Sequence, residues 1–204
     1  MSSRDHTIFD SSLAAFALVN ARNGAERPLP ARPPGRPCRL AGGSSTTMSI
    51  GFAPEPEPTA NIAELGEGQT TGPLPLGFEF EFFGVRYTWF DLSSGGFMTF
   101  GTQPRRSFIP LSADLDNFIA LGWTDGYTLS RKQVAYEVRG SAHRRRLVLS
   151  CTLVPESPEN GLETMTAQLV LHERTGMIDA HTARQDPVAN RVSQEAIRFT
   201  TAPW

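Results

Sequence analysis

Residues 78–101 read FEFEFFGVRYTWFDLSSGGFMTFG and contain seven of the thirteen phenylalanines of the chain. In the first five residues, Phe78–Phe82, rings alternate with carboxylates. A period of two places the three rings on one face of a strand and the two carboxylates on the other. A platform that stacks bases or sugars would expose aromatic and basic groups together, whereas the outward face here is acidic. The stretch therefore predicts a half-buried strand whose rings belong to a core.

The same alternation recurs along the chain after Asn61, and no helical period interrupts it. Turns rich in glycine and serine separate the segments, with SSGG at 93–96 and RTG at 174–176 as the clearest. The pattern predicts an all-β, jelly-roll-like antiparallel β-sandwich over 61–204. The expected strands lie in 78–82, 86–92, 96–100, 117–124, 134–140, 145–154, 165–173, 177–183 and 195–200. The residues expected between the two sheets are Phe78, Phe80, Trp89, Phe97, Trp123, Tyr136, Leu149, Leu169 and Leu171.

Residues 1–60 have a different composition and are predicted to form an extended N-terminal arm. ERPLPARPPGRP (26–37) and APEPEPT (53–59) are stiff strips, because proline fixes φ and removes donors. A short helix is expected at 10–23, capped by Asp10 and ended by the Asn23-Gly24 pair. A stiff strip loses little entropy on docking, so we expect the arm to bind neighbouring subunits. The partner-binding residues expected are Phe9, Leu13, Phe16, Leu18, Leu29, Arg32 and Arg36.

The bulk composition narrows the range of partners. A net charge of −2 gives no strong attraction to nucleic acid, and no apolar run approaches the roughly 20 residues of a membrane span. LAAFALV (13–19) resembles the apolar part of a signal peptide, but the residues before it lack the expected positive charge. Met48 is an alternative start. Cys38 and Cys151 do not make a disulfide framework, and whether they pair is open.

The chemistry-bearing side chains form only incomplete sets. Asp114, Asp116 and Asn117 lack the glycine and distal glutamate of a calcium loop. His172 and His181 have only Asp179 as a nearby third zinc ligand. No nucleophile elbow or phosphate loop occurs, so we expect no catalytic residue, no metal and no cofactor. HRRR (143–146) is expected to be a solvated turn, the alternative being a salt bridge to a copy of the acidic strip.

Four segments resemble, in the right order, a β-sandwich module of bacterial extracellular and surface proteins and of some phage structural proteins. They are LPLGFEFEFFGVRYTWFDLSSGGFMTFG (74–101), FIALGWTD (118–125), VAYEVRGSAHRRRLVLS (134–150) and TAQLVLHERTGMIDAHTA (166–183). The likeness covers residues 74–200. It departs at Gly95, where the module often has asparagine, which puts any role of that amide in doubt. The resemblance implies a binding or structural unit and carries no catalytic residue.

Two functions fit these observations better than an enzyme does. The first is a structural component of a large assembly, above all a phage virion protein (capsid decoration, head or tail) anchored by its arm; its partners would be copies of itself or capsid and tail proteins. A phage protein leaves the cell by lysis and needs no signal peptide. The alternative is a secreted or cell-surface adhesive module that binds carbohydrate or a cell-surface partner.

Overall fold

The computed structural model describes residues 5–10, 15–20, 46–66, 69–94, 96–101, 117–120, 127–155, 164–186 and 191–200. Within these residues the chain forms thirteen strands and no helix. The strands are β1 (Asp5–Asp10), β2 (Ala15–Asn20), β3 (Thr46–Ser49), β4 (Asn61–Glu64), β5 (Leu74–Phe82), β6 (Val85–Ser93), β7 (Phe97–Thr99), β8 (Phe118–Ala120), β9 (Tyr127–Arg139), β10 (Arg146–Pro155), β11 (Thr164–His172), β12 (Met177–Asp186) and β13 (Arg191–Thr200).

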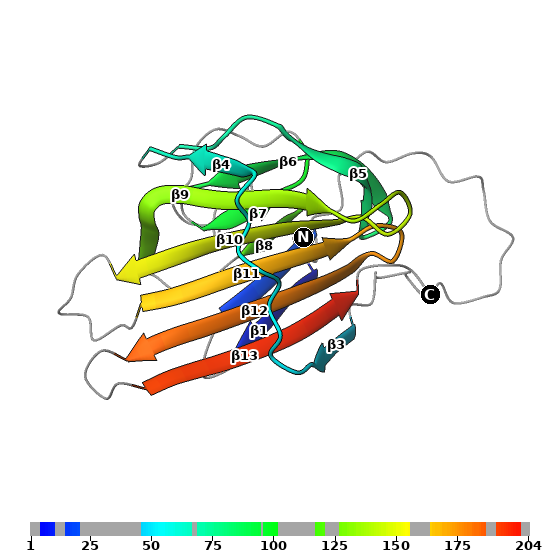
Figure 1. The fold of residues 1–204 in the computed structure, drawn as a ribbon. Coiled ribbons are helices and arrows are strands. Elements are labelled where there is room, and N and C mark those ends of the chain that lie inside the picture. Colours follow the sequence, from blue (N-terminus) through cyan, green and yellow to red (C-terminus); the bar gives the residue numbers. More distant parts are fainter. Residues whose placement is uncertain are drawn as a thin grey trace, which may run out of the picture.

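Two antiparallel sheets face each other, so the predicted all-β sandwich is confirmed (Figure 1). The smaller sheet has the order β1-β2-β8-β7-β6-β5, and the larger has the order β3-β13-β12-β11-β10-β9-β4. Strands β9 to β13 follow one another in chain order, as do β5 to β8. Within each run a strand pairs with its successor in the chain, which is what alternating segments separated by turn residues favour.

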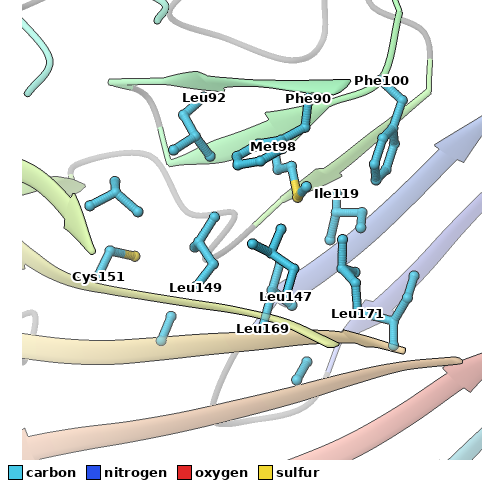
Figure 2. Close-up of a cluster of buried hydrophobic side chains, with 14 of the residues drawn as sticks. Phe90, Leu92, Met98, Phe100, Ile119, Leu147, Leu149, Cys151, Leu169 and Leu171 are labelled. Carbon is cyan, nitrogen blue, oxygen red and sulfur yellow. The ribbon is translucent and has the colours of Figure 1, made fainter. Parts of the chain in front are cut away.

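Side chains from both sheets meet in one apolar core (Figure 2). Along β5 burial alternates, so that Phe78, Phe80 and Phe82 point inward as the sequence predicts. The ring of Phe100 lies 5.7 Å from that of Phe80 and 4.7 Å from that of Phe82, centroid to centroid. Burial of each phenylalanine side chain stabilises the folded state by roughly 1.5–3 kcal/mol. On the facing sheet the inward row includes Leu149, Leu169 and Leu171, also as predicted.

Four of the predicted core residues need comment. The prediction that Trp89 is buried is wrong. Trp89 is 53% exposed, because Phe90 and Leu92 take the inward positions of β6 and the alternation of the strand places Trp89 on the outer face. Phe97 is buried, but it lies against Phe118 outside the core cluster. Tyr136 is partly buried and packs on the core. Trp123 lies outside the described residues.

Strand β5 contains an irregularity at Gly77 that contacts the larger sheet. The register of β5 against β6 shifts between Pro75 and Phe80, and Gly77 adopts a φ of +77° within the shift. A Cβ at Gly77 would lie 3.1 Å from a methyl carbon of Val138, so the position favours glycine on both counts. Arg145 donates to the carbonyl of Gly77 at 2.5 Å, which ties a turn of the larger sheet to the smaller sheet.

Both predicted turns are present. The N–H of Gly96 donates to the carbonyl of Ser93 at 3.0 Å, and Gly96 has a φ of +77°. The 174–176 turn joins β11 to β12, with Leu171 opposite Ile178. Glycine at these positions supplies the left-handed conformation that a tight reversal needs.

The N-terminal quarter of the chain differs from the prediction in two ways. Residues 15–20 form strand β2 rather than part of a helix, because β1 and β8 offer this short apolar run strands to pair with. In addition, residues 46–60 lie on the sandwich: β3 pairs with β13, and residues 50–60 then cross the sheet to reach β4. We call residues 50–60 the strap.

Candidate interaction site

The strap runs across the outer face of the larger sheet from one edge to the other (Figure 1). It begins where the N–H of Ile50 donates to the carbonyl of Ala196 on β13, at 3.1 Å. It ends at β4, where Asn61 lies opposite Tyr136 on β9. Beneath it, Val148 and Val170 are 0% and 2% exposed although they point away from the core. The strap therefore covers a face that would otherwise be solvated.

Glu55 is the central contact of the strap. Its N–H donates to the side-chain oxygen of Gln168 at 2.7 Å, and the amide of Gln168 donates back to the carbonyl of Glu55 at 2.9 Å. Its carboxylate accepts two bonds from Arg146, at 2.5 and 2.9 Å. Such a two-pronged pair is the strong form of an arginine–carboxylate contact. The hydrogen bonds from Arg146 lower the pKa of Glu55.

Arg139 holds the next residues of the strap. Its guanidinium donates to the carbonyls of Pro56 at 2.8 Å and Glu57 at 3.3 Å, and it lies 3.5 Å from the carboxylate of Glu55. Glu137 accepts from the same guanidinium at 2.8 Å. Prolines cannot donate hydrogen bonds, so Arg139 holds this part of the strap through carbonyls and the carboxylate of Glu55. The acidic, proline-containing strip thus meets a matching pair of arginines.

The HRRR turn had been expected to be solvated, but two of its arginines form salt bridges. Arg146 pairs with the acidic strip of its own chain, and Arg145 pairs with Glu173 at 2.7 Å. The hydrogen bond from Arg145 lowers the pKa of Glu173 to about 2. The alternative of a salt bridge to the acidic strip therefore describes the turn better, although the contact lies within one chain.

A cavity of about 190 Å³ lies between the strap and the sheet, with Phe52, Glu55, Gln168 and His181 in its wall. At roughly 30 Å³ per molecule it has room for several waters. The ring of Phe52 meets the ring of His181 edge-on at 5.8 Å. Burial lowers the pKa of His181, and its Nδ1 has no hydrogen-bond partner among the described residues.

A second charged cluster lies on the outer face at β11, β12 and β13. Asp179 accepts two bonds from Arg198, at 2.5 and 2.7 Å, and contacts the ring of His172 at 2.9 Å. Burial alone would raise the pKa of Asp179, but the hydrogen bonds from Arg198 and His172 outweigh it and hold that pKa well below its usual range. The carboxylate considered as a zinc ligand is thus occupied by an arginine.

The N-terminal strand pair, β1 with β2, is attached at a different place. The two strands pair along six residues each, with Phe9 opposite Phe16. Their link to the sandwich is shorter, since β2 pairs with β8 only at Leu18–Ile119 and Val19–Phe118. Residues 21–45 separate this pair from β3 and lie outside the described residues. The strand pair is therefore an edge addition to the smaller sheet.

The predicted partner-binding residues fall into two groups. Phe9, Phe16 and Leu18 lie on β1 and β2, while Leu13, Leu29, Arg32 and Arg36 lie outside the described residues. The contacts of the strap with Arg139 and Gln168 were not predicted, and a salt bridge of the HRRR turn to the acidic strip was considered only as an alternative, between copies of the chain. The alternation of acid and proline in 54–58 was the available signal, but its partners lie more than eighty residues away.

Within the described ranges, no three His, Cys, Asp or Glu side chains gather in a way that could hold a metal ion; Asp114 and Asp116 lie outside those ranges. No helix in the part of the chain that the structure describes is long and apolar enough to cross a membrane.

Burial raises the pKa of the Cys151 thiol to about 12, so this cysteine is chemically inert.

The comparisons with known proteins gave one match. A family model described as NIDO related matches residues 44–200. No curated protein and no solved structure matches the chain. The match begins two residues before β3, so it includes the strap and both of its edge strands, and it excludes the N-terminal strand pair.

Proposed function

We propose that this chain, which belongs to the NIDO-related family through residues 44–200, is a non-enzymatic structural component of a protein assembly. The family match covers the larger sheet, the strap and strands β5 to β8 of the smaller sheet. The N-terminal strand pair lies outside the match and adds to one sheet edge through two residue pairs. This edge addition is the observation that carries the proposal, because strand addition at a sheet edge is a common way in which proteins join.

The charged side chains of the described residues support a structural role. Strongly shifted carboxyl groups are candidates for catalysis when they line a cleft without a structural partner. Here Asp179 and Glu173 have lowered pKa values because arginines bind them. Glu55 is likewise held by Arg146 and serves to fix the strap. These groups hold strands and turns together, which is the chemistry of a scaffold.

Among assemblies, we favour a phage virion, with the chain as a decoration, head or tail component. The resemblance of residues 74–200 to a module of phage structural and bacterial surface proteins supports either setting. An N-terminal extension that reaches a neighbour suits a lattice of identical subunits, in which the same contact is repeated. Mass spectrometry of purified particles is expected to detect the chain; its presence only in cell-envelope fractions would contradict the virion location.

A carbohydrate-binding adhesive module is the second candidate, and Trp89 favours it. The side chain is 53% exposed on the face of the smaller sheet that points away from the core. Large amphipathic rings on a surface supply contact area for ligands. A glycan array would test this candidate: binding that is lost in Trp89→Ala would support the adhesive function.

The assembly function is tested by sedimentation velocity of the full chain over a hundredfold range of concentration. We expect species larger than the monomer that become more populated as concentration rises. The matched comparison is the chain from residue 44 onward, which keeps the whole family match. We expect it to sediment as a monomer or to be poorly soluble. A full chain that stays monomeric over the whole range would contradict the proposed function.

A further inference from the structure

We propose that the N-terminal strand pair of one copy completes the smaller sheet of a second copy of this chain, by pairing its β2 with the neighbour's β8. The inference rests on the proposed function and names the partner and the contact. The structure shows the same pairing within one chain, with Leu18 opposite Ile119 and Val19 opposite Phe118. Exchange of an identical element between copies uses a contact that already fits.

The sandwich needs this strand pair to cover its core. The rings of Phe90 on β6 and Tyr136 on β9 meet at 5.7 Å, so the β5–β6 end of the smaller sheet lies over β9. Following both sheet orders, β1 and β2 then lie opposite β12 and β13 (Figure 1). Figure 2 shows pale blue strands of this part of the chain beside Leu171.

The residues at that end are strongly apolar. Ile178 and Phe199 are 0% exposed, and Ile197 is 6% exposed. All three belong to the core cluster. If no strand covered them, they would form an exposed apolar patch, which favours aggregation. The strand pair must therefore be supplied either by the same chain or by a neighbour.

The backbone pairing within one chain is short. Strand β8 has three residues, and β2 meets it at two positions. The next strand in the chain, β3, belongs to the other sheet. Few backbone hydrogen bonds must therefore break when the strand pair changes partner, and the apolar contacts that it leaves in one copy are made again in the next.

The connecting segment is long enough for a neighbour. Residues 21–45 number 25, and five of the twelve residues from Glu26 to Pro37 are proline. A chain of 25 residues can reach at most about 80–90 Å. A compact module of about 150 residues is roughly 40 Å across, so this number of residues is enough to reach past one module to the next.

The second copy is the partner that the geometry fits best. Only a copy of this chain presents the same β8 edge in the same register. Reciprocal exchange would close a twofold dimer, and one-way exchange would build an open chain of subunits. Both arrangements contain the same β2–β8 contact between copies, so one experiment detects either.

The experiment uses two full-length chains that each carry one new cysteine. The register of β2 against β8, continued by one residue, places Ala17 opposite Ala120. Ala17→Cys and Ala120→Cys change each side chain little, and both chains carry Cys38→Ser so that only the new thiols react. Buried Cys151 stays. The two chains are co-expressed and mildly oxidised, and the 17–120 disulfide is located by peptide mass spectrometry. Ala17→Cys co-expressed with Thr88→Cys, an exposed position on β6, is the control.

We expect a disulfide-linked dimer of the Ala17→Cys and Ala120→Cys chains in most of the oxidised protein, and no dimer in the control. No dimer, together with ring closure within single chains of the Ala17→Cys/Ala120→Cys double variant, would overturn the exchange. If sedimentation then still showed association, the proposed function would stand without the exchange. A mixed sample of labelled and unlabelled unsubstituted chains provides a second readout, because β2-to-β8 NOEs between copies need no substitution. Their absence alongside β2-to-β8 NOEs within one chain would also overturn it.

Discussion

The strap and the N-terminal strand pair come from the same quarter of the chain but are held in opposite ways. The strap contacts five strands in turn, through backbone bonds at its ends and through Arg139, Arg146 and Gln168 at its centre. The strand pair forms backbone pairs with the sandwich at only two positions of one short strand. The family match includes the first and excludes the second.

The difference shows that a proline-rich, coreless segment can be an integral part of a domain. The two regions differ in the density of their specific side-chain and backbone hydrogen bonds with the sandwich. A segment held by several charge-assisted bonds opens only with much of the domain, whereas a segment held by a few edge bonds opens locally. The strap is thus expected to behave as part of the module and the strand pair as an exchangeable element.

The largest effect is expected in the core beneath both regions. Leu149→Ala removes a side chain that is 1% exposed between the two sheets. The lost burial and the remaining cavity should lower the free energy of unfolding by about 2–5 kcal/mol. Ile62→Ala is the control, because Ile62 is 59% exposed at the end of the strap. Chemical denaturation measures both. A loss below about 0.5 kcal/mol in Leu149→Ala would contradict the core assignment.

Breaking the centre of the strap should cost less. Glu55→Gln removes the carboxylate that Arg146 binds through two hydrogen bonds. Bonds to charged groups are worth about 1.5–3 kcal/mol when buried, and partial exposure of this pair reduces the expected loss to about 1–2 kcal/mol. Glu79→Gln is the matched control, since the Glu79–Arg86 pair is mostly exposed. Equal losses in the two variants would show that the Glu55–Arg146 contact stabilises the folded state no more than the exposed Glu79–Arg86 pair does.

Acid should weaken the strap in a definite range of pH. The folded chain holds the pKa of Glu55 below its ordinary value of 4.5, so the contact stabilises the folded state above pH 4.5. The stabilisation is lost as the pH falls from about 4.5 through the folded pKa, because the unfolded chain then binds the extra proton. Unfolding free energies measured between pH 6 and pH 3 should fall less steeply in Glu55→Gln than in the natural chain. Parallel curves would contradict this assignment.

The smallest effect is expected at His181, beneath the strap. Burial lowers its pKa from 6.5, so the folded chain keeps the ring neutral where the unfolded chain begins to bind a proton. Stability should therefore decline slightly as the pH falls below about 6.5. The groups that face the ring are Asp179, Arg198, Glu55 and Phe52. In His181→Gln the decline between pH 7 and pH 5.5 should disappear; its persistence would assign it to another group.

The sequence predicts those parts of the fold that depend on local pattern. Alternation placed Phe78, Phe80, Leu149 and Leu169 correctly in the core, since a period of two leaves one inward face. It failed at Trp89, because hydrophobicity alone does not say which of two adjacent aromatic residues, Trp89 or Phe90, points inward.

The interaction site was harder to predict, because its contacts join distant positions. Glu55 meets Arg146 across ninety-one positions, and nothing in the local sequence indicates that pairing. The same limit applies to residues 15–20, which had been expected to form part of a helix. Their strand depends on pairing with β8, about one hundred positions away.

Hydrogen exchange of the full chain at low and high protein concentration tests the central claim most directly. The amides of Ile50 and Glu55 in the strap, together with the paired amides of β3 and β4, should be protected equally at both concentrations, because the strap and its edge strands belong to the module. The amides of residues 5–10 and 15–20 should be weakly protected at low concentration and strongly protected at high concentration, as copies exchange strands. Equal protection of the strand pair at both concentrations, or rapid exchange of the strap, would contradict the account.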